Sequence, residues 1–213
     1  MNILKSRKSF KNIVLIALVL MLSFCMASCG SDSKDEDAGN PPAQSGDTST
    51  ATGNAPVARI EMEDGGIIEV QLDPAEAPLS VENFVKLAKE GFYDGLIFHR
   101  VISGFMIQGG GYDPDMAKMD APTVKGEFKA NDVENNLSHA RGIISMARID
   151  GQNDSASSQF FIVHEDSPFL DGNYAAFGEV ISGMDVVDRI AEVATDNAGL
   201  PAKPIVIKTI TIQ

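Results

Sequence analysis

The stretch VARIEMEDGGIIEVQL, residues 57–72, constrains the fold more than any other part of the chain. Apolar and polar residues alternate on both sides of Asp64-Gly65, which is the period-two pattern of a strand with one buried face. An Asp-Gly pair between two such runs is a strong indication of a tight turn. The stretch therefore predicts a β-hairpin.

Further strand-like runs recur along the chain, separated by turn residues. They cover residues 96–102, 105–108, 142–148, 159–163, 175–180 and 205–212. Strands do not alternate regularly with helices, so a doubly wound parallel sheet is disfavoured, and closure of an antiparallel sheet would remove exposed edges. The predicted fold is all-β with two capping helices, a closed eight-stranded antiparallel β-barrel.

The two helices are predicted from their apolar stripes and end signals. One lies within residues 78–92, with Ser80 as its N-cap and Gly91 just past its end, and the other covers residues 184–193. Residues 109–141 contain no convincing element. Loops of that length are usually functional, or they contain elements that the sequence pattern does not reveal.

The N-terminal residues resemble a bacterial lipoprotein signal. Four basic residues precede IVLIALVLMLSF (13–24), an apolar run that is short for a membrane span. Because MASC (26–29) follows, residues 1–28 are predicted to be a lipoprotein-type signal peptide, with Cys29 as the lipidated residue. Two alternatives stay open, namely ordinary signal cleavage with a spare cysteine and an uncleaved membrane helix.

Residues 29–56 are predicted to form a lipid-anchored, disordered, acidic and polar linker. The segment after Cys29 contains no aromatic and no large aliphatic residue, so nothing offsets the entropy of ordering it. Such a chain reaches roughly 30 Å, which holds a domain clear of a membrane. Residues 57–213 then form one domain, extracytoplasmic and lipid-anchored to a bacterial membrane on its cell-surface or periplasmic side.

Charge and cysteine usage limit the chemistry of this domain. The chain has a net charge of −13, all of it in residues 57–213, so nucleic acid and anionic lipid should be repelled. Its two cysteines are Cys25, in the signal, and Cys29. The domain therefore has no thiol for a disulfide, a metal or nucleophilic catalysis.

Other common sites also lack support in the sequence. The spacings of His99, His139 and His164 match no metal-ligand motif, and we expect a structural or solvated role for each. No G-x-S-x-G is present, and no serine has an evident base nearby. QGGGYD is not a phosphate-binding loop. We therefore predict no metal and no cofactor.

FHRVISGFMIQGG is mostly apolar but contains Arg100 and Gln108. Burying an unpaired polar group costs several kcal/mol, and burying a charge costs more. Strand geometry puts Met106 and Gln108 on one face, and SSQFFI repeats the association of Gln159 with aromatic residues. A role in the core alone does not explain this set of residues, which indicates a binding surface.

The blocks FHRVISGFMIQGG, GIISMAR, SSQFFI and FLDGNYAAFGEV, in this order and at this spacing, resemble the signature blocks of the cyclophilin family of peptidyl-prolyl isomerases. VENFVKLAKEGFYDG is similar to the family's first helix. The resemblance runs from about residue 58 to residue 212. It implies an eight-stranded antiparallel barrel closed by two helices, loops around a peptide groove, and catalysed rotation of Xaa-Pro bonds in extracytoplasmic proteins that assists their folding.

The resemblance also implies roles for particular residues. Arg100 is expected to be the catalytic residue, in a catalytic set with Phe105 and Gln108. The other substrate-binding residues are expected to be Met106, Ala147, Arg148, Gln159, Phe161, Phe169, Leu170 and Tyr174. The expected partners are proline-containing peptides and unfolded protein clients, bound by a monomer.

Two positions depart from many eukaryotic members, because Phe169 replaces a tryptophan and Tyr174 replaces a histidine. Both side chains can still wall a groove, but the missing indole N–H argues against tight cyclosporin binding. Two other hypotheses are a non-catalytic proline-peptide-binding chaperone or docking module, and a structural surface lipoprotein. The intact Arg100 favours catalysis, since simple binding needs no cation against an amide nitrogen.

Overall fold

The computed structural model describes residues 55–213. The predicted signal peptide (1–28), Cys29 and the predicted linker up to residue 54 lie outside the described residues. Pro56, at the end of that linker, already takes part in the fold, because its carbonyl accepts a 2.9 Å hydrogen bond from the Leu72 amide.

The predicted hairpin is confirmed. Strands β1 (Val57–Met62) and β2 (Ile67–Leu72) pair antiparallel, with Val57 opposite Gln71. Gly65 lies in the turn at φ +88°, a conformation that residues with a Cβ rarely adopt. The alternating pattern buries every second residue of both strands.

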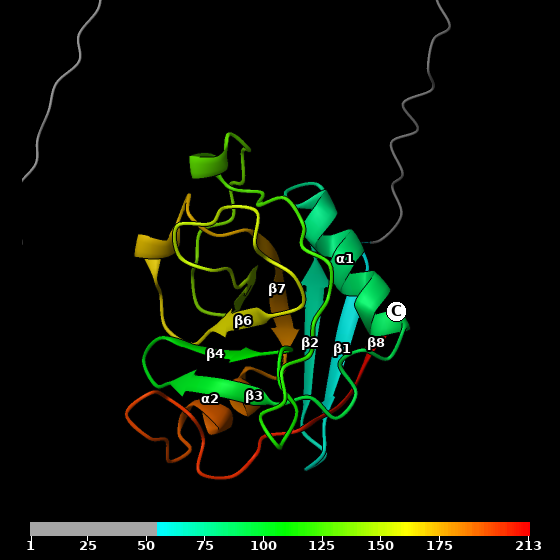
Figure 1. The fold of residues 1–213 in the computed structure, drawn as a ribbon, viewed down its shortest axis with the longest axis vertical. Helices are drawn as coiled ribbons and strands as arrows, with labels where there is room; N and C mark the ends of the chain where they lie inside the picture. Colours follow the sequence, from blue (N-terminus) through cyan, green and yellow to red (C-terminus); the bar gives the residue numbers. More distant parts are fainter. Residues whose placement is uncertain (1–54) are drawn as a thin grey trace, which may run out of the picture. The chain divides into compact units, whose positions relative to one another are not determined.

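The remaining strands extend this hairpin into one sheet. They are β3 (Phe98–Ile102), β4 (Met106–Gly109), β5 (Ile143–Met146), β6 (Phe160–Val163), β7 (Ala176–Ser182) and β8 (Ile207–Ile212). The strand order is β3-β4-β6-β5-β7-β2-β1-β8, and each strand pair is antiparallel. The all-β prediction is therefore confirmed, and the strands curl into a half-barrel (Figure 1).

The prediction of a closed barrel is wrong. The sheet is open, with β3 and β8 at its two ends. Between these ends, an isolated bridge pairs Ile97 with Val206, and the Ile207 amide donates to the Leu96 carbonyl at 2.8 Å. Proline has no backbone N–H, so Pro204, just before β8, cannot donate to a continuous ladder there.

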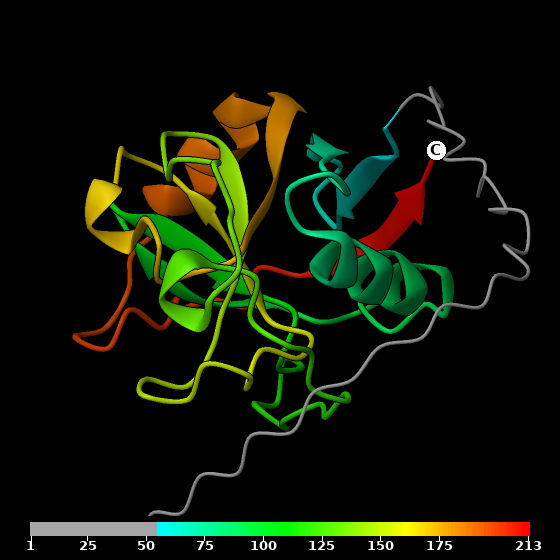
Figure 2. The ribbon, with the colours of Figure 1, turned by 90° about the horizontal axis from the view of Figure 1, so that it is seen from above.

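Two α-helices accompany the sheet, as predicted. Helix α1 (Pro78–Lys89) packs beside β7 and β8, and α2 (Met184–Ala191) packs against β2, β3 and β4. The two helices cover different parts of the curled sheet (Figures 1 and 2). None of the helices between residues 55 and 213 has the length and apolar character that crossing a membrane requires.

The N-terminus of α1 is stabilised from a distance, contrary to the prediction that Ser80 caps it. The helix begins at Pro78, and Ser80 is buried inside its first turn. The buried carboxylate of Glu127 accepts hydrogen bonds from the Leu79 amide (2.8 Å), the Ser80 amide (2.8 Å) and the Ser80 hydroxyl (2.6 Å). Glu127 thus satisfies the free N–H groups of the first turn.

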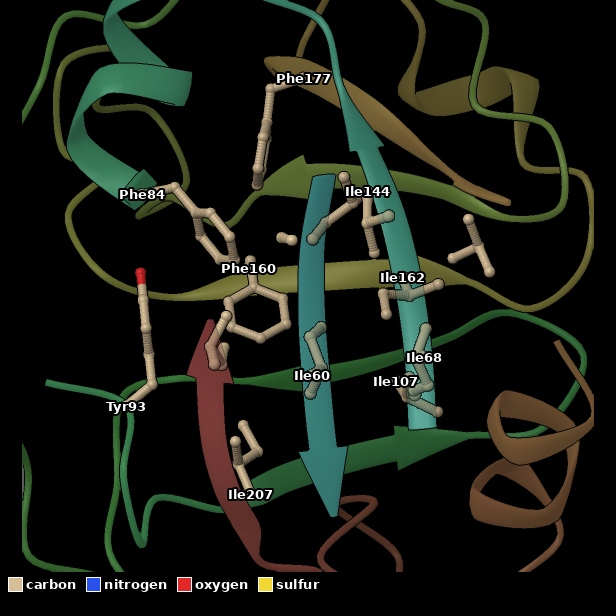
Figure 3. Packing of buried hydrophobic residues seen from close by; sticks show 14 of the residues in the cluster. Ile60, Ile68, Phe84, Tyr93, Ile107, Ile144, Phe160, Ile162, Phe177 and Ile207 are labelled. Atoms are coloured by element: carbon tan, nitrogen blue, oxygen red, sulfur yellow. The ribbon is translucent and has the colours of Figure 1, made fainter. Parts of the chain in front are cut away.

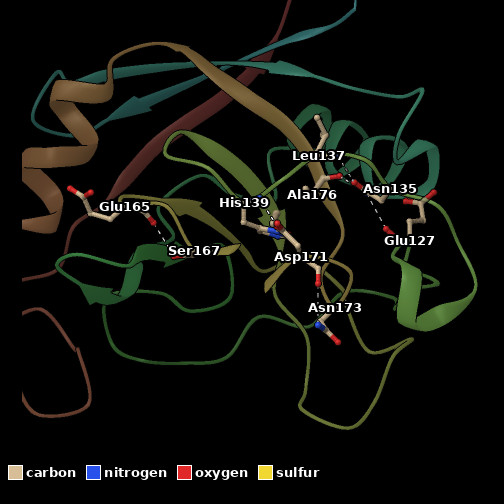
Figure 4. A network of polar contacts seen from close by, with 10 residues as sticks. Glu127, Asn135, Leu137, His139, Glu165, Ser167, Asp171, Asn173 and Ala176 are labelled. Atoms are coloured by element: carbon tan, nitrogen blue, oxygen red, sulfur yellow. Dashed lines mark hydrogen bonds and ion pairs between the residues drawn. The ribbon is translucent and has the colours of Figure 1, made fainter. Parts of the chain in front are cut away.

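The long segment before β5 contains one short 3-10 helix, η1 (Lys129–Asn131), and isolated bridges. Asn135 ties it to the sheet, because its amide donates to the Glu127 carbonyl (3.1 Å) and to the Ala176 carbonyl (2.8 Å) (Figure 4). The second 3-10 helix, η2 (Pro168–Leu170), lies between β6 and β7.

The main core fills the inside of the curled sheet. Aromatic rings from α1 and the sheet meet there, with the Phe84 and Phe160 centroids 5.4 Å apart in an edge-on arrangement (Figure 3). Ile60, Ile68 and Ile144 pack with them and are fully buried. A smaller cluster, containing Met106, Ile143, Phe161, Val163, Leu170 and Ala176, is separate from this core and underlies the site described next.

Candidate active site

Four neighbouring strands put one row of side chains across the sheet. Arg100 on β3 pairs with Gln108 on β4, Gln108 pairs with Phe161 on β6, and Phe161 pairs with Ser145 on β5. Directly paired residues project from the same face of a sheet. The register therefore brings the predicted cation, amide and aromatic ring onto one face.

A cavity of about 140 Å³ opens beside this row. Its lining residues are Arg100, Phe105, Met106, Gln108, Ala147, Arg148, Phe161, Leu170 and Tyr174. The structure thus brings together all the predicted groove residues except Gln159 and Phe169, which lie next to the cavity. Met106, Phe161 and Leu170 are buried in the smaller apolar cluster, so this part of the wall is apolar and fixed by packing.

The guanidinium of Arg100 stands at the edge of this apolar surface. Its Nη1 lies 3.4 Å from Gln108 Oε1 and 3.8 Å from the sulfur of Met106. Among residues 55–213, no Asp or Glu forms an ion pair with Arg100. The charge of Arg100 is therefore available to a ligand in the cavity.

Gln108 links Arg100 to Gln159. The Gln108 Nε2 group donates a 2.9 Å hydrogen bond to Gln159 Oε1, which orients the Gln108 amide. Gln159 lines a second cavity of about 490 Å³, which also contacts Gln108, Ala147 and Arg148. Residues of the long segment before β5 and of residues 149–157 form the rest of its wall.

Phe105 and Phe169 form an aromatic pair at the rim. Their ring centroids lie 5.4 Å apart, and Phe169 is 68% exposed. Phe105 comes from the turn between β3 and β4, whereas Phe169 comes from η2. The pair extends the apolar wall outward from the cavity.

Arg148 is held by two aromatic rings from the loops before η1 and after η2. Its guanidinium carbon lies 4.8 Å from the centroid of Tyr174 and 5.2 Å from that of Phe128, distances typical of cation–π contacts. Its Nε donates to the Asn173 carbonyl at 2.9 Å, and its Nη1 donates to the Ile149 carbonyl at 3.2 Å. These contacts fix a second positive charge at the cavity wall.

A hydrogen-bonded Ser–His–Asp chain of side chains lies behind the apolar wall, with its serine and histidine buried, and the sequence did not predict it. His139 Nδ1 lies 2.9 Å from Asp171 Oδ1 (Figure 4). His139 Nε2 lies 3.0 Å from Ser145 Oγ. The expectation that no serine has a base nearby is therefore wrong for Ser145. However, Ser145 is fully buried, and the His139 ring stacks on Phe161 at 6.0 Å. The chain supports the wall of the cavity and offers no accessible nucleophile.

Burial favours the neutral form of His139 in this group of three side chains. Loss of solvation lowers the pKa of His139, although the bond to Asp171 opposes this change. The neutral ring then donates from Nδ1 to Asp171 and accepts at Nε2 from the Ser145 hydroxyl. No group of three His, Cys, Asp or Glu residues suited to a metal ion occurs in the described part of the chain.

Comparisons with known proteins identify the family of the chain. Residues 57–212 match the family model described as "Cyclophilin type peptidyl-prolyl cis-trans isomerase/CLD". The chain is 50% identical over 157 residues to peptidyl-prolyl cis-trans isomerase A of Dickeya dadantii, covering 69% of this chain and 80% of the relative. It is 40% identical over 160 residues to peptidyl-prolyl cis-trans isomerase B of Escherichia coli, covering 70% of this chain and 94% of that protein.

Solved structures show the same fold. A crystal structure of a Cryptosporidium parvum cyclophilin-type isomerase in the presence of the dipeptide Ala-Pro has a TM-score of 0.65 and 30% sequence identity, and the match covers 74% of this chain and 98% of that one. The family match, the curated relatives and the fold together show that the chain belongs to the cyclophilin family of peptidyl-prolyl cis-trans isomerases.

Proposed function

We propose that the cavity beside Arg100 is the proline site of this isomerase and that Arg100 is its catalytic residue. The position of the guanidinium carries the proposal, because it lies at the edge of an apolar cavity, beside Gln108, without an ion-pair partner among residues 55–213. A cation placed there without a carboxylate is suited to an electron-rich group of a ligand.

The chemistry of the prolyl bond explains what such a cation does. Amide resonance opposes rotation with a barrier of roughly 18–20 kcal/mol. At the half-rotated state the proline nitrogen recovers its lone pair and becomes a hydrogen-bond acceptor. A guanidinium N–H directed at that nitrogen stabilises the transition state more than either planar isomer, which is the condition for catalysis. The reaction needs no nucleophile and no proton transfer.

The surrounding residues are proposed to hold the peptide. Phe105, Met106, Phe161 and Leu170 would receive the proline ring, and Gln108 would donate an amide N–H to a substrate carbonyl. Ala147, Arg148, Gln159, Phe169 and Tyr174 would line the groove on either side. The Ala-Pro dipeptide in the similar Cryptosporidium parvum structure supports a proline-containing ligand.

We further propose that the protein acts outside the cytoplasm as a monomeric lipoprotein that assists the folding of client proteins. The basic start, the apolar run and the MASC sequence support lipidation at Cys29. Metabolic labelling with a fatty acid, in wild type and in Cys29→Ser, tests this proposal. Label that remains in the Cys29→Ser variant would contradict lipidation at this residue.

Exchange spectroscopy tests the catalytic assignment. Wild-type protein should accelerate cis/trans exchange of a short Xaa-Pro peptide, and Arg100→Ala should abolish the acceleration. The competing hypothesis is a non-catalytic proline-peptide receptor or docking module. Peptide binding without accelerated exchange in the wild type would support that alternative instead.

A further inference from the structure

The turn between β3 and β4 carries Phe105 to the cavity. Ile102 pairs with Met106 across this turn, and the Phe105 amide donates to the Ile102 carbonyl at 3.0 Å. Gly104 has φ +75° and occupies the position before Phe105. The direction of the Phe105 ring therefore depends on how firmly this short turn is held.

His164 follows β6 directly and forms two hydrogen bonds to the turn, one to Gly104 and one to Phe105. The Gly104 amide donates to His164 Nδ1 at 3.0 Å, and the His164 amide donates to the Phe105 carbonyl at 2.9 Å. Because the Gly104 N–H is a donor, Nδ1 must carry a lone pair. The neutral ring therefore has its proton on Nε2.

The other side of the imidazole faces a charged group on α2. Its Nε2 lies 3.3 Å from Asp188 Oδ1, a buried oxygen that also lies 2.7 Å from Arg141 Nη2. Arg141 binds Asp188 Oδ2 at 2.8 Å and the His164 carbonyl at 2.8 Å, and its amide donates to Asp166. The adjacent Glu165 donates its own amide to the Phe105 carbonyl at 3.4 Å.

We propose that His164 is a positioning residue for prolyl isomerisation, acting through Gly104 and Phe105. The neutral imidazole holds the turn, and the turn holds the Phe105 ring against the proline. This inference rests on the assignment of Phe105 to the proline site.

Two substitutions separate the two sides of the ring. In His164→Asn the side-chain oxygen takes the place of Nδ1 and accepts from Gly104, but nothing reaches Asp188. In His164→Gln the amide reaches Asp188, but the acceptor for Gly104 is lost. We expect His164→Asn to retain kcat/KM within about twofold of wild type and His164→Gln to lose about fivefold, as for one hydrogen bond to a backbone N–H. Equal losses in the two variants would overturn the inference.

Hydrogen exchange of the Gly104 amide provides a readout that a purely structural role would not separate between the two variants. The Gly104 amide donates to His164 Nδ1, so its exchange should stay slow in His164→Asn and become faster in His164→Gln. Equal exchange rates of the Gly104 amide in the two variants would overturn the inference.

Phe105→Ala distinguishes failure of the inference from failure of the site. It should lower kcat/KM more than either His164 variant does. An unchanged kcat/KM in Phe105→Ala would refute the proline-site assignment itself, and the inference with it. If Phe105→Ala is impaired and the two His164 variants do not differ, the site stands and His164 has no positioning role.

Discussion

Arg100 and Gln108 face each other across β3 and β4, with Arg100 Nη1 3.4 Å from Gln108 Oε1. This contact and the bond to Gln159 together determine which way the Gln108 amide points. Its oxygen faces the cation, and its NH₂ group faces Gln159 Oε1. One of the two N–H donors of Gln108 is thereby used, and the second is left for a substrate carbonyl.

Replacing Arg100 by lysine should remove most activity. A lysine ammonium is a point charge without the planar fork of a guanidinium, so it cannot direct the same N–H at the proline nitrogen. We expect kcat/KM to fall at least about tenfold, which corresponds to about 1.4 kcal/mol of transition-state stabilisation. Arg59→Lys, on β1, is the matched control and should leave kcat/KM unchanged. Near-normal turnover of Arg100→Lys would refute the assigned role.

Removing the amide of Gln159 should weaken catalysis without removing it. In Gln159→Leu the Gln108 amide loses the acceptor that orients it. We expect about a threefold loss of kcat/KM, as for one neutral hydrogen bond. Gln152→Leu changes another glutamine at the wall of the second cavity and should have no effect. Equal kcat/KM values for Gln159→Leu and Gln152→Leu would show that the orientation of Gln108 does not depend on Gln159.

Replacing Glu127 by alanine should destabilise the fold. Its carboxylate is buried and accepts three hydrogen bonds from the first turn of α1. Loss of these bonds should lower the free energy of unfolding by about 3 kcal/mol. Urea titration measures this change. Glu82→Ala, an exposed position on the same helix, should change stability by less than about 0.5 kcal/mol, and similar losses in both variants would argue against the capping role.

Stability should decrease at mildly acidic pH, in part because of His99. Burial lowers the pKa of His99 to about 4. In the unfolded chain the imidazole binds its proton near pH 6.5, so as the pH falls from 6.5 to 4 the unfolded state binds a proton that the folded state does not. The contribution to stability is complete above pH 6.5 and is lost progressively toward pH 4.

We expect His99 to account for about 1–2 kcal/mol of the difference in unfolding free energy between pH 7 and pH 5. Urea titrations at both pH values, in wild type and in His99→Gln, measure this component. The variant should show the smaller difference between the two pH values. The same difference in both proteins would mean that His99 is not the group responsible.

The strands could be predicted from sequence because their signals are local. Alternation around Asp64-Gly65 indicated the first hairpin, and the structure places β1 and β2 there. Whether the barrel closes depends on contacts between segments that are far apart in the sequence. Residues near Ile97 would have to pair continuously with residues before β8, and Pro204 cannot donate a hydrogen bond there. The number and direction of the strands were therefore predictable, and the open edge was not.

Contacts between distant segments account for the other differences. Ser80 is of a residue type that commonly caps helices, but Glu127, 47 residues further along the sequence, accepts the hydrogen bonds of the first turn instead. The chain of Ser145, His139 and Asp171 joins β5 to the loops before β5 and after η2. No spacing rule connects these residues. By contrast, Arg100 and Gln108 were recognisable because polar residues inside apolar runs are rare.

Exchange spectroscopy on one proline peptide, recorded for wild type and Arg100→Ala, tests the central claim most directly, because it yields the peptide affinity and the rate of bound-state exchange from the same sample. If Arg100 acts on the half-rotated bond, the exchange rate should fall by about 100-fold or more, as expected for loss of a preorganised charged donor. The Kd should change by less than about threefold, since apolar contacts dominate ground-state binding. A parallel loss of affinity and rate, or an unchanged rate, would contradict the assignment of Arg100 as the catalytic residue.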